Sequence, residues 1–332
     1  MLRALVAAVL LTGLPTWSGA RDINAILDQH VIPRYQTLVE STAALSDAAQ
    51  ADCTHDSAAL RAAYHDAFDA WIGVSHLRFG PSEIDNRAFA LAFWPDSRGA
   101  TPKALSGLIR DADPVVEDPE GFKAVSVAAR GFYALEFLLY DPAFADQGDA
   151  AYRCTLIQAV ARDIAENSAD ILNDWDPDYA ALLREAGSND TYRSENEAAK
   201  QFFTALTTGL EFTGDMRIGR PLGTFDAPRP NRAEARRSER SLQNVVLSLD
   251  STRELAALLS DNDPDLDATF ARALDRAAGL EDDPVFASVT NPQDRIAVEV
   301  FQQSVSSIRQ LLALELGPSL GIEAGFNALD GD

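Results

Sequence analysis

Apolar residues recur every three or four positions along most of this 332-residue chain, and the strict alternation typical of β-strands is nearly absent. This periodicity predicts a protein made almost wholly of α-helices. Several predicted helices begin with an Asx residue followed by proline, which suits an N-cap and a first helical position. These pairs are Asp118-Pro119, Asp176-Pro177, Asp263-Pro264 and Asn291-Pro292. The long helices are expected at 23–50, 55–77, 120–140, 150–174, 192–214, 231–260, 264–279 and 292–315.

Turn signals in the middle of the chain divide these helices into two groups of four. The first group ends near Trp175-Asp176-Pro177, and the second begins after Gly187-Ser188-Asn189-Asp190. The fold class expected is all-α, with two packed four-helix bundles and long connecting loops. The corresponding units are 21–178 and 179–332.

Two connections are too long to be simple turns. One runs from Phe79 to Thr101 and contains Trp94-Pro95-Asp96, and the other runs from Arg217 to Pro230 and contains Gly219-Arg220-Pro221. Loops of this length inside a compact domain are either functional or structural Ω-type loops. The sequence leaves both interpretations open.

The segment from Val125 to Tyr140 is apolar on nearly every helical face, which is typical of a central, buried helix. Glu136 stands in its middle, and a buried carboxylate must be paired, protonated or bound to a metal. Tyr133 and Tyr140 share a face with Glu136 at helical spacing. Gly131 lowers helix propensity and permits close approach by another backbone. The face predicts either a hydrogen-bond network with an arginine or a ligand pocket between the bundles.

The N-terminus has the layout of a secretory signal peptide. Arg3 supplies a positive charge, residues 4–14 are mostly apolar, and Ser18-Gly19-Ala20 resembles a cleavage site. We therefore expect residues 1–20 to be removed and the mature protein to be exported to the periplasm. No segment is apolar for long enough to predict a membrane span. In an oxidising compartment, the two cysteines, Cys53 and Cys154, are expected to form a disulfide.

The chain is strongly acidic, with 51 acidic and 28 basic residues and a net charge of −23. Such a surface repels nucleic acid and anionic lipid, so neither is an expected partner. The same surface would tolerate or attract cations. The simplest interpretation of the charge is solubility.

Several stretches, taken in order, resemble a periplasmic branch of the imelysin-like family. Gly131 to Glu136 resembles the family signature G-x-H-x-x-E. The other stretches are Leu77 to Pro81, Phe93 to Asp96, Leu135 to Asp141 and Gly325 to Asp332. The resemblance covers most of the mature chain and implies two helical bundles with a site at their interface. It also implies a link to bacterial iron uptake, in a family catalogued among metallopeptidases.

The chain departs from the family pattern at the motif histidine, where Tyr133 stands. A second departure lies at Ser238-Glu239, where relatives carry a Ser-His pair. Zinc hydrolysis needs about three protein ligands and an open water position, and neither H-x-x-x-H nor H-E-x-x-H occurs. We expect His76 to be a surface or cap residue and His65 to lie on a solvated helix face. The sequence therefore favours a protein that is not an enzyme.

The favoured function is a non-catalytic binding or accessory protein linked to iron uptake, with a ligand pocket around Tyr133 and Glu136. Phenolate and carboxylate oxygens would suit iron or another divalent or trivalent metal. Periplasmic or outer-membrane uptake proteins are the expected partners. The alternatives are an arginine-built pocket for an anion or small molecule, a metallopeptidase-like enzyme, and a structural or interaction protein with a degenerate site. The further candidate binding residues are Arg78, Trp94, Asp96, Arg217, Arg220, Ser238, Glu239 and Arg240.

Overall fold

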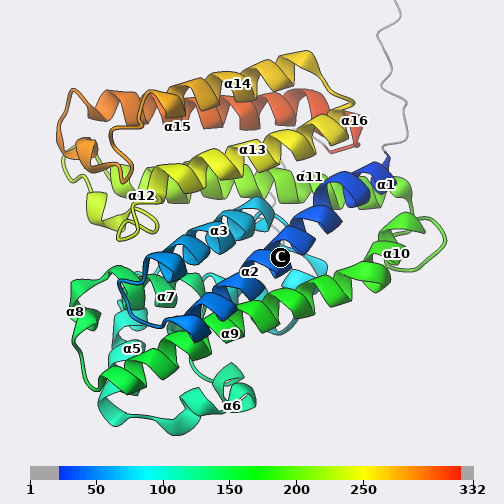
Figure 1. Cartoon of the computed structure of the whole chain (residues 1–332). Helices are drawn as coiled ribbons and strands as arrows, with labels where there is room; N and C mark the ends of the chain where they lie inside the picture. Colours follow the sequence, from blue (N-terminus) through cyan, green and yellow to red (C-terminus); the bar gives the residue numbers. More distant parts are fainter. Residues whose placement is uncertain (1–21, 323–332) are drawn as a thin grey trace, which may run out of the picture.

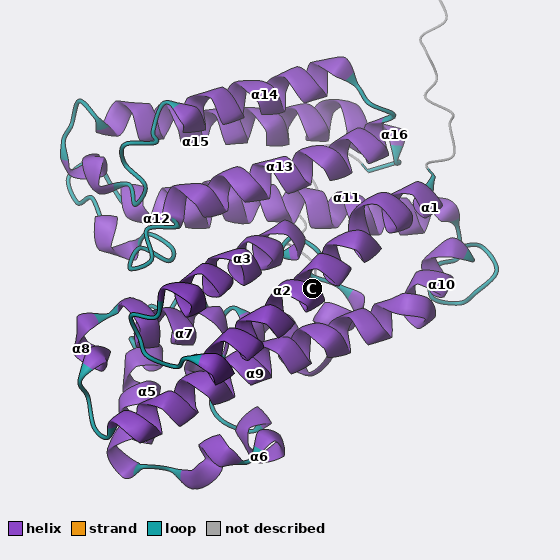
Figure 2. Cartoon of the chain, in the orientation of Figure 1, coloured by secondary structure: helices purple, strands orange, loops and turns teal. Residues whose placement is uncertain are grey.

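The computed structural model describes residues 22–322, and these residues form helices joined by turns and loops (Figure 2). Within that range no β-strand occurs, and a single isolated bridge pairs Thr224 with Ala227. The prediction of an all-α fold with two packed helical bundles is confirmed. The predicted signal peptide and the stretch from Gly325 to Asp332 lie outside the described residues.

The N-terminal bundle is built around four helices. A short helix α1 (Ile23–Ile26) continues through a π-helical turn, Leu27–Val31, into α2. Helix α2 packs along both α3 and α9, and α7 packs against α9 (Figure 1). The bounds are α2 Ile32–Ala51, α3 Ala58–Val74, α7 Gly131–Tyr140 and α9 Ala150–Asp174.

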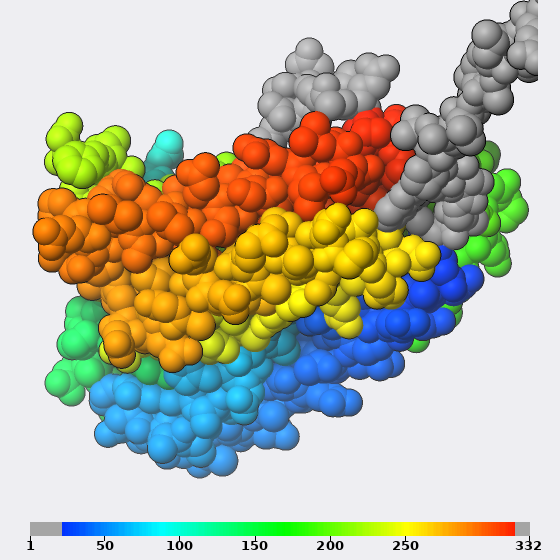
Figure 3. All heavy atoms as spheres, turned by 90° about the horizontal axis from the view of Figure 1, so that it is seen from above, coloured from blue at the N-terminus to red at the C-terminus, as the bar shows by residue number. Residues whose placement is uncertain are grey.

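The C-terminal bundle also contains four long helices. Helix α13 packs against α11 and α14, and α14 packs along α15. Seen from above, α13, α14 and α15 cover one face of the molecule (Figure 3). Helices α1 and α3 of the N-terminal bundle lie against α13, which joins the two bundles. The bounds are α11 Glu195–Glu211, α13 Ser241–Ser260, α14 Pro264–Ala278 and α15 Arg295–Leu311.

Further helices occupy the connections. The long connection that begins at Phe79 contains α4 and leads directly into α5, a helix of twelve residues that the sequence prediction missed. The side chain of Asp96 caps α5, because its oxygens accept from the amides of Ala100 and Thr101. The bounds are α4 Arg87–Leu91, α5 Ala100–Asp111, α6 Pro119–Lys123, α8 Pro142–Ala145, α10 Ala180–Arg184, α12 Gly219–Leu222 and α16 Gly317–Ser319.

The predicted helix 120–140 is wrong as a single element. It is divided into α6, a 3-10 turn at Val127–Ala129, and α7. The chain bends at Gly131, where φ is +74° and an added Cβ would lie 2.3 Å from the carbonyl oxygens of Ala90 and Leu91. Glycine is required here because only a residue without Cβ allows both this conformation and this close approach.

The predicted helix 231–260 begins too early. Helix α13 begins at Ser241, and residues 233–240 form an irregular segment that we call the 233–240 loop. Ala235 and Glu239 have positive φ values of 44° and 58° in this loop. Non-glycine residues in this conformation cost on the order of 1–3 kcal/mol each and persist only where their surroundings enforce it.

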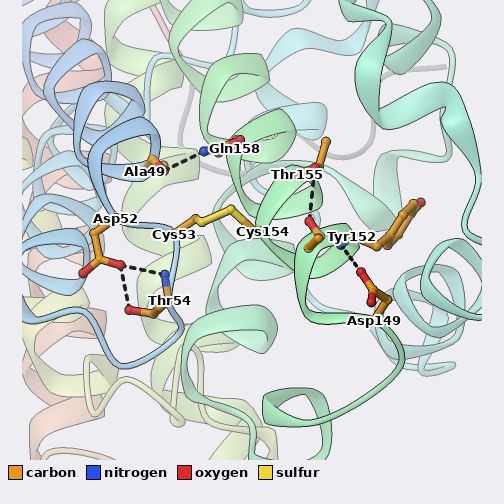
Figure 4. Close-up of a disulfide and its surroundings, with 10 residues drawn as sticks. Ala49, Asp52, Cys53, Thr54, Asp149, Tyr152, Cys154, Thr155 and Gln158 are labelled. Carbon is orange, nitrogen blue, oxygen red and sulfur yellow. Dashed lines mark hydrogen bonds between the residues drawn. A yellow bond between two sulfur atoms is a disulfide. The ribbon is translucent and has the colours of Figure 1, made fainter.

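The predicted disulfide is confirmed. Cys53 follows α2 and Cys154 lies near the start of α9, with their Cα atoms 5.0 Å apart (Figure 4). The side chain of Gln158 donates to the carbonyl of Ala49 close to the bridge. The covalent bond therefore ties together the ends of two helices that already pack along each other.

Candidate functional site

The candidate site lies where α7 of the N-terminal bundle meets the 233–240 loop of the C-terminal bundle. Tyr133 is 6% exposed and Glu136 is 2% exposed. Both side chains reach across the interface, so that contacts between residues about a hundred positions apart hold the two bundles together. Helix α7 and the segment after α12 lie at the same end of the molecule (Figure 1).

The carboxylate of Glu136 is held by the 233–240 loop. Its Oε1 accepts from the Arg237 amide at 2.9 Å, from the Ser238 amide at 3.0 Å and from the Ser238 hydroxyl at 3.0 Å. Burial raises the pKa of Glu136, although these amides and the Arg237 guanidinium oppose that shift. The left-handed residues Ala235 and Glu239 flank the two amides and set the direction in which they point.

Tyr133 takes part in a second network, centred on Glu234. The Tyr133 hydroxyl donates to Glu234 Oε1 at 2.5 Å, while Arg217 Nε and Asn244 Nδ2 donate to Oε2 at 2.9 and 3.0 Å. Burial raises the pKa of Tyr133 well above its ordinary value, and the negative charge of Glu234 raises it further. The phenol therefore stays protonated and acts as a hydrogen-bond donor.

Arg240 joins the network to α3. Its guanidinium forms an ion pair with Asp69, hydrogen-bonds Nδ1 of His65 at 2.9 Å and lies over the Phe68 ring. The other ring nitrogen of His65 is 2.8 Å from the Tyr140 hydroxyl. Tyr140 is the third residue on the predicted face of α7. It is thus linked to the second bundle through the half-buried His65 and the buried Arg240.

Trp94 forms the edge of this cluster. Its ring stacks on that of Tyr133, with centroids 6.3 Å apart, and contacts the Phe212 ring edge-on at 5.8 Å. The guanidinium of Arg220 lies over the Trp94 ring, 5.6 Å from its centroid. The structure therefore brings together seven of the candidate residues, which are Tyr133, Glu136, Arg217, Ser238, Arg240 and, at the edge, Trp94 and Arg220.

Three candidate residues lie elsewhere or have another role. Arg78 is exposed and pairs with Glu83 at 2.6 Å. Asp96 caps α5, and although burial alone would raise its pKa, the amides of Thr101, Ala100 and Arg98 lower it. Glu239 is exposed, and its side chain forms no hydrogen bond or ion pair among the described residues.

Sequence reasoning missed the residue at the centre of the network, Glu234. The predicted helix 231–260 made it one polar residue among many, whereas its side chain is 1% exposed and binds three partners. Its position beside several arginines in an otherwise acidic chain was the available signal.

A buried histidine pair was also missed. His30 and His76 are 0% and 3% exposed, and their Nε2 atoms are 2.9 Å apart. The expectation that His76 is a surface or cap residue is wrong. Glu254 lies 2.9 Å from Nδ1 of His30, and because a carboxylate only accepts, His30 donates to it and the proton between the rings belongs to His76. This pair joins the N-terminal bundle to α13.

The cluster around Tyr133 and Glu136 does not fit a metal centre. Across residues 22–322, no group of three His, Cys, Asp or Glu side chains is arranged to hold a metal ion. Oε1 of Glu136 and both carboxylate oxygens of Glu234 already accept hydrogen bonds from the protein's own donors, and the guanidinium of Arg217 would repel a cation. The arrangement suits the fixing of one bundle against the other.

Comparison with known proteins identifies the family. The imelysin family model matches residues 31–312. The chain is 24% identical over 328 residues to iron-regulated protein A of Synechococcus elongatus, covering 90% of this chain and 86% of the relative. The crystal structure of an imelysin-like protein from Psychrobacter arcticum 273-4 has the same fold, with a TM-score of 0.76 and 21% identity over 92% of this chain and 96% of the other. This chain therefore belongs to the imelysin family.

Proposed function

We propose that this protein is a non-catalytic binding or accessory protein of iron uptake that works in the periplasm. Its family and the name of its relative, iron-regulated protein A, support the link to iron. The signal-like residues 1–20 support export. None of the helices within residues 22–322 is both long and apolar enough to cross a membrane.

The observation that carries this proposal is that three of the site's four carboxylate oxygens, Oε1 of Glu136 and both oxygens of Glu234, already accept hydrogen bonds from the protein. Three protein groups donate to Glu136 Oε1, and three others donate to the two oxygens of Glu234. A catalytic zinc site requires an open coordination position, and an activated nucleophile requires a nearby free base. The cluster offers neither, so iron enters this proposal as the cargo of the pathway and not as an ion held by Tyr133 and Glu136.

The proposal is tested by iron accumulation in cells. A strain without the protein should take up less iron under iron limitation, and the wild-type chain should restore uptake. A Glu136→Gln variant keeps an acceptor for the two loop amides, so it should also restore uptake. Equal iron accumulation with and without the protein would contradict the proposed role.

A second arm addresses the peptidase alternative. Purified mature protein should not cleave an unfolded protein substrate when zinc is added, because Tyr133 replaces the motif histidine. Chelator-sensitive cleavage that disappears in Glu136→Gln would instead support a metallopeptidase. Visible absorption after Fe(III) addition tests the metal assignment, since a Tyr133 phenolate bound to ferric iron would give a charge-transfer band.

A further inference from the structure

The chain reverses its charge in one segment. The protein carries a net charge of −23, yet residues 217–240 contain seven arginines and three acidic residues. Three of these arginines are paired, each with a carboxylate: Arg217 with Glu234, Arg237 with Asp141, and Arg240 with Asp69. The other four form no ion pair with any residue in the range 22–322, and they are Arg220, Arg229, Arg232 and Arg236.

Unpaired arginines are unexpected where carboxylates are so abundant. Arg220 is partly buried, and its Nε is buried without a hydrogen-bond partner among the described residues. Burial lowers the pKa of Arg220, and the nearby charge of Arg232 lowers it further. Helix α12, which carries Arg220, packs against the 3-10 turn Pro230–Arg232, and neither arginine forms an ion pair among the described residues, an arrangement that an anion would stabilise.

The backbone after α12 holds the arginines in place. Gly223 turns the chain with φ of +57°, and an added Cβ would lie 2.5 Å from the carbonyl oxygen of Ala227. The amide of Arg229 then donates to the carbonyl of Pro221 at 2.9 Å, and the amide of Arg232 donates to the carbonyl of Arg229 at 2.8 Å. This tight turn brings the 3-10 turn Pro230–Arg232 back against α12, the helix that carries Arg220.

Trp94 connects these arginines to the interbundle network. Arg220 lies over Trp94, and Trp94 stacks on Tyr133. A planar ligand group could bind the guanidinium edge while the Trp94 ring provides an apolar wall, which is how many small-molecule sites combine a few polar groups with an aromatic surface. A ligand bound here would bridge the Trp94 connection of one bundle and the α12 segment of the other.

We propose that Arg220, Arg229 and Arg232, with Trp94, form a binding site for a small polycarboxylate. The guanidinium fork matches a carboxylate in two parallel hydrogen bonds, and several arginines select a molecule that carries several such groups. The inference rests on the proposed function, because polycarboxylates are oxygen chelators that keep ferric iron in solution. The acidic remainder of the surface disfavours nucleic acid as the anion.

Calorimetric titration of the mature protein with citrate tests the site. Wild-type protein should bind citrate, and Arg220→Gln should weaken binding at least about tenfold, the loss of one charge-assisted interaction. Arg220→Lys keeps the charge but removes the fork, so it should restore only part of the affinity. Arg232→Gln, a change at an exposed position, provides a second variant that should fold normally.

Arg276→Gln is the matched control. Arg276 is exposed on α14 and makes no ion pair within residues 22–322, so this variant changes the net charge equally at a distant position. It should bind citrate as the wild type does. Equal weakening by Arg276→Gln and Arg220→Gln, or no citrate binding by wild type at millimolar concentration, would overturn the proposal.

Two further measurements are needed. One compares citrate with inorganic phosphate as the bound anion, and the other tests the binding site separately from the iron-uptake role. Inorganic phosphate should bind more weakly than citrate, and phosphate binding of equal strength would overturn the polycarboxylate assignment. Citrate binding in a protein whose loss leaves cellular iron unchanged would refute the iron-uptake role and keep the site. Lowered cellular iron together with a protein that does not bind citrate would refute the site and keep the role.

Discussion

The Tyr133 hydroxyl makes the hydrogen bond from α7 to Glu234 that the structure describes, and Tyr133 stands in place of a histidine of the family signature. Its value can be measured with Tyr133→Phe. This change leaves Glu234 Oε1 buried without its donor, and we expect a loss of about 1–3 kcal/mol in the free energy of unfolding. Urea denaturation followed by circular dichroism gives the measurement.

Tyr152→Phe is the control for the Tyr133 variant. The Tyr152 hydroxyl donates to the backbone carbonyl of Asp113 at 3.0 Å in a half-buried position, where water can replace it. This variant should lose less than Tyr133→Phe. Equal losses would show that Tyr133 is one ordinary hydrogen bond and that the Glu234 network has no special weight.

At the scale of the element, α7 owes its position to Gly131. Gly131→Ala would place a Cβ against the carbonyl oxygens of Ala90 and Leu91 and force a strained φ, so we expect a loss of more than about 2 kcal/mol in unfolding free energy. Gly107→Ala is the matched control, because nothing lies within 4 Å of its added Cβ inside α5. It should stabilise the protein by about 0.5–1 kcal/mol. Similar effects in both variants would contradict the account.

The same glycine shows what the sequence could and could not predict. Local periodicity is enough to predict the long helices, because each carries its own apolar face. The break before Gly131 could not be predicted, since it depends on backbone carbonyls about forty residues away. Glu136 could be recognised because an apolar helix surrounds it. For Glu234 the sequence offers only its arginine-rich surroundings, since its partner Tyr133 is 101 positions away.

The buried pair of His30 and His76 predicts that the folded state loses stability in acid. His30 lies in the π-helical turn Leu27–Val31, and His76 follows α3. Burial lowers the pKa of His76 well below its ordinary value, and His30, Arg34 and Arg217 lower it further. Burial likewise lowers the pKa of His30, while Glu254 opposes the shift. A histidine with a lowered pKa binds its proton more readily in the unfolded state. The free energy of unfolding should therefore fall as the pH drops below about 6.5.

A variant of the pair, His76→Gln, and a control, His55→Gln, isolate the contribution of the histidine pair to this pH dependence. Urea denaturation between pH 7.5 and pH 5 should show a shallower pH dependence for His76→Gln than for the wild type, because one buried titrating ring is gone. His55→Gln changes a histidine outside the pair and should keep the wild-type slope. Parallel curves for all three proteins would mean that carboxylates and not the histidine pair control the acid response. His30→Gln should behave as His76→Gln does.

For the whole molecule, we expect the disulfide to contribute to how firmly α7, the helix that carries Tyr133 and Glu136, is held. The bridge joins residues 101 positions apart, and this loop contains α3, α5 and α7. In the chain-entropy account, closing a loop of about 100 residues stabilises the folded state by about 4.7 kcal/mol. A Cys53→Ser/Cys154→Ser double variant should lose a large part of that free energy, and reductant should lower the stability of the wild type but not that of the variant.

Hydrogen exchange in the double variant should increase first in the amides of α7. The 233–240 loop, which contacts α7, lies outside the loop that the disulfide closes. We therefore expect this loop to hold α7 in place only while the N-terminal bundle stays packed. A double variant with wild-type stability and unchanged exchange in α7 would show that the packing of α2 along α9 suffices without the bond.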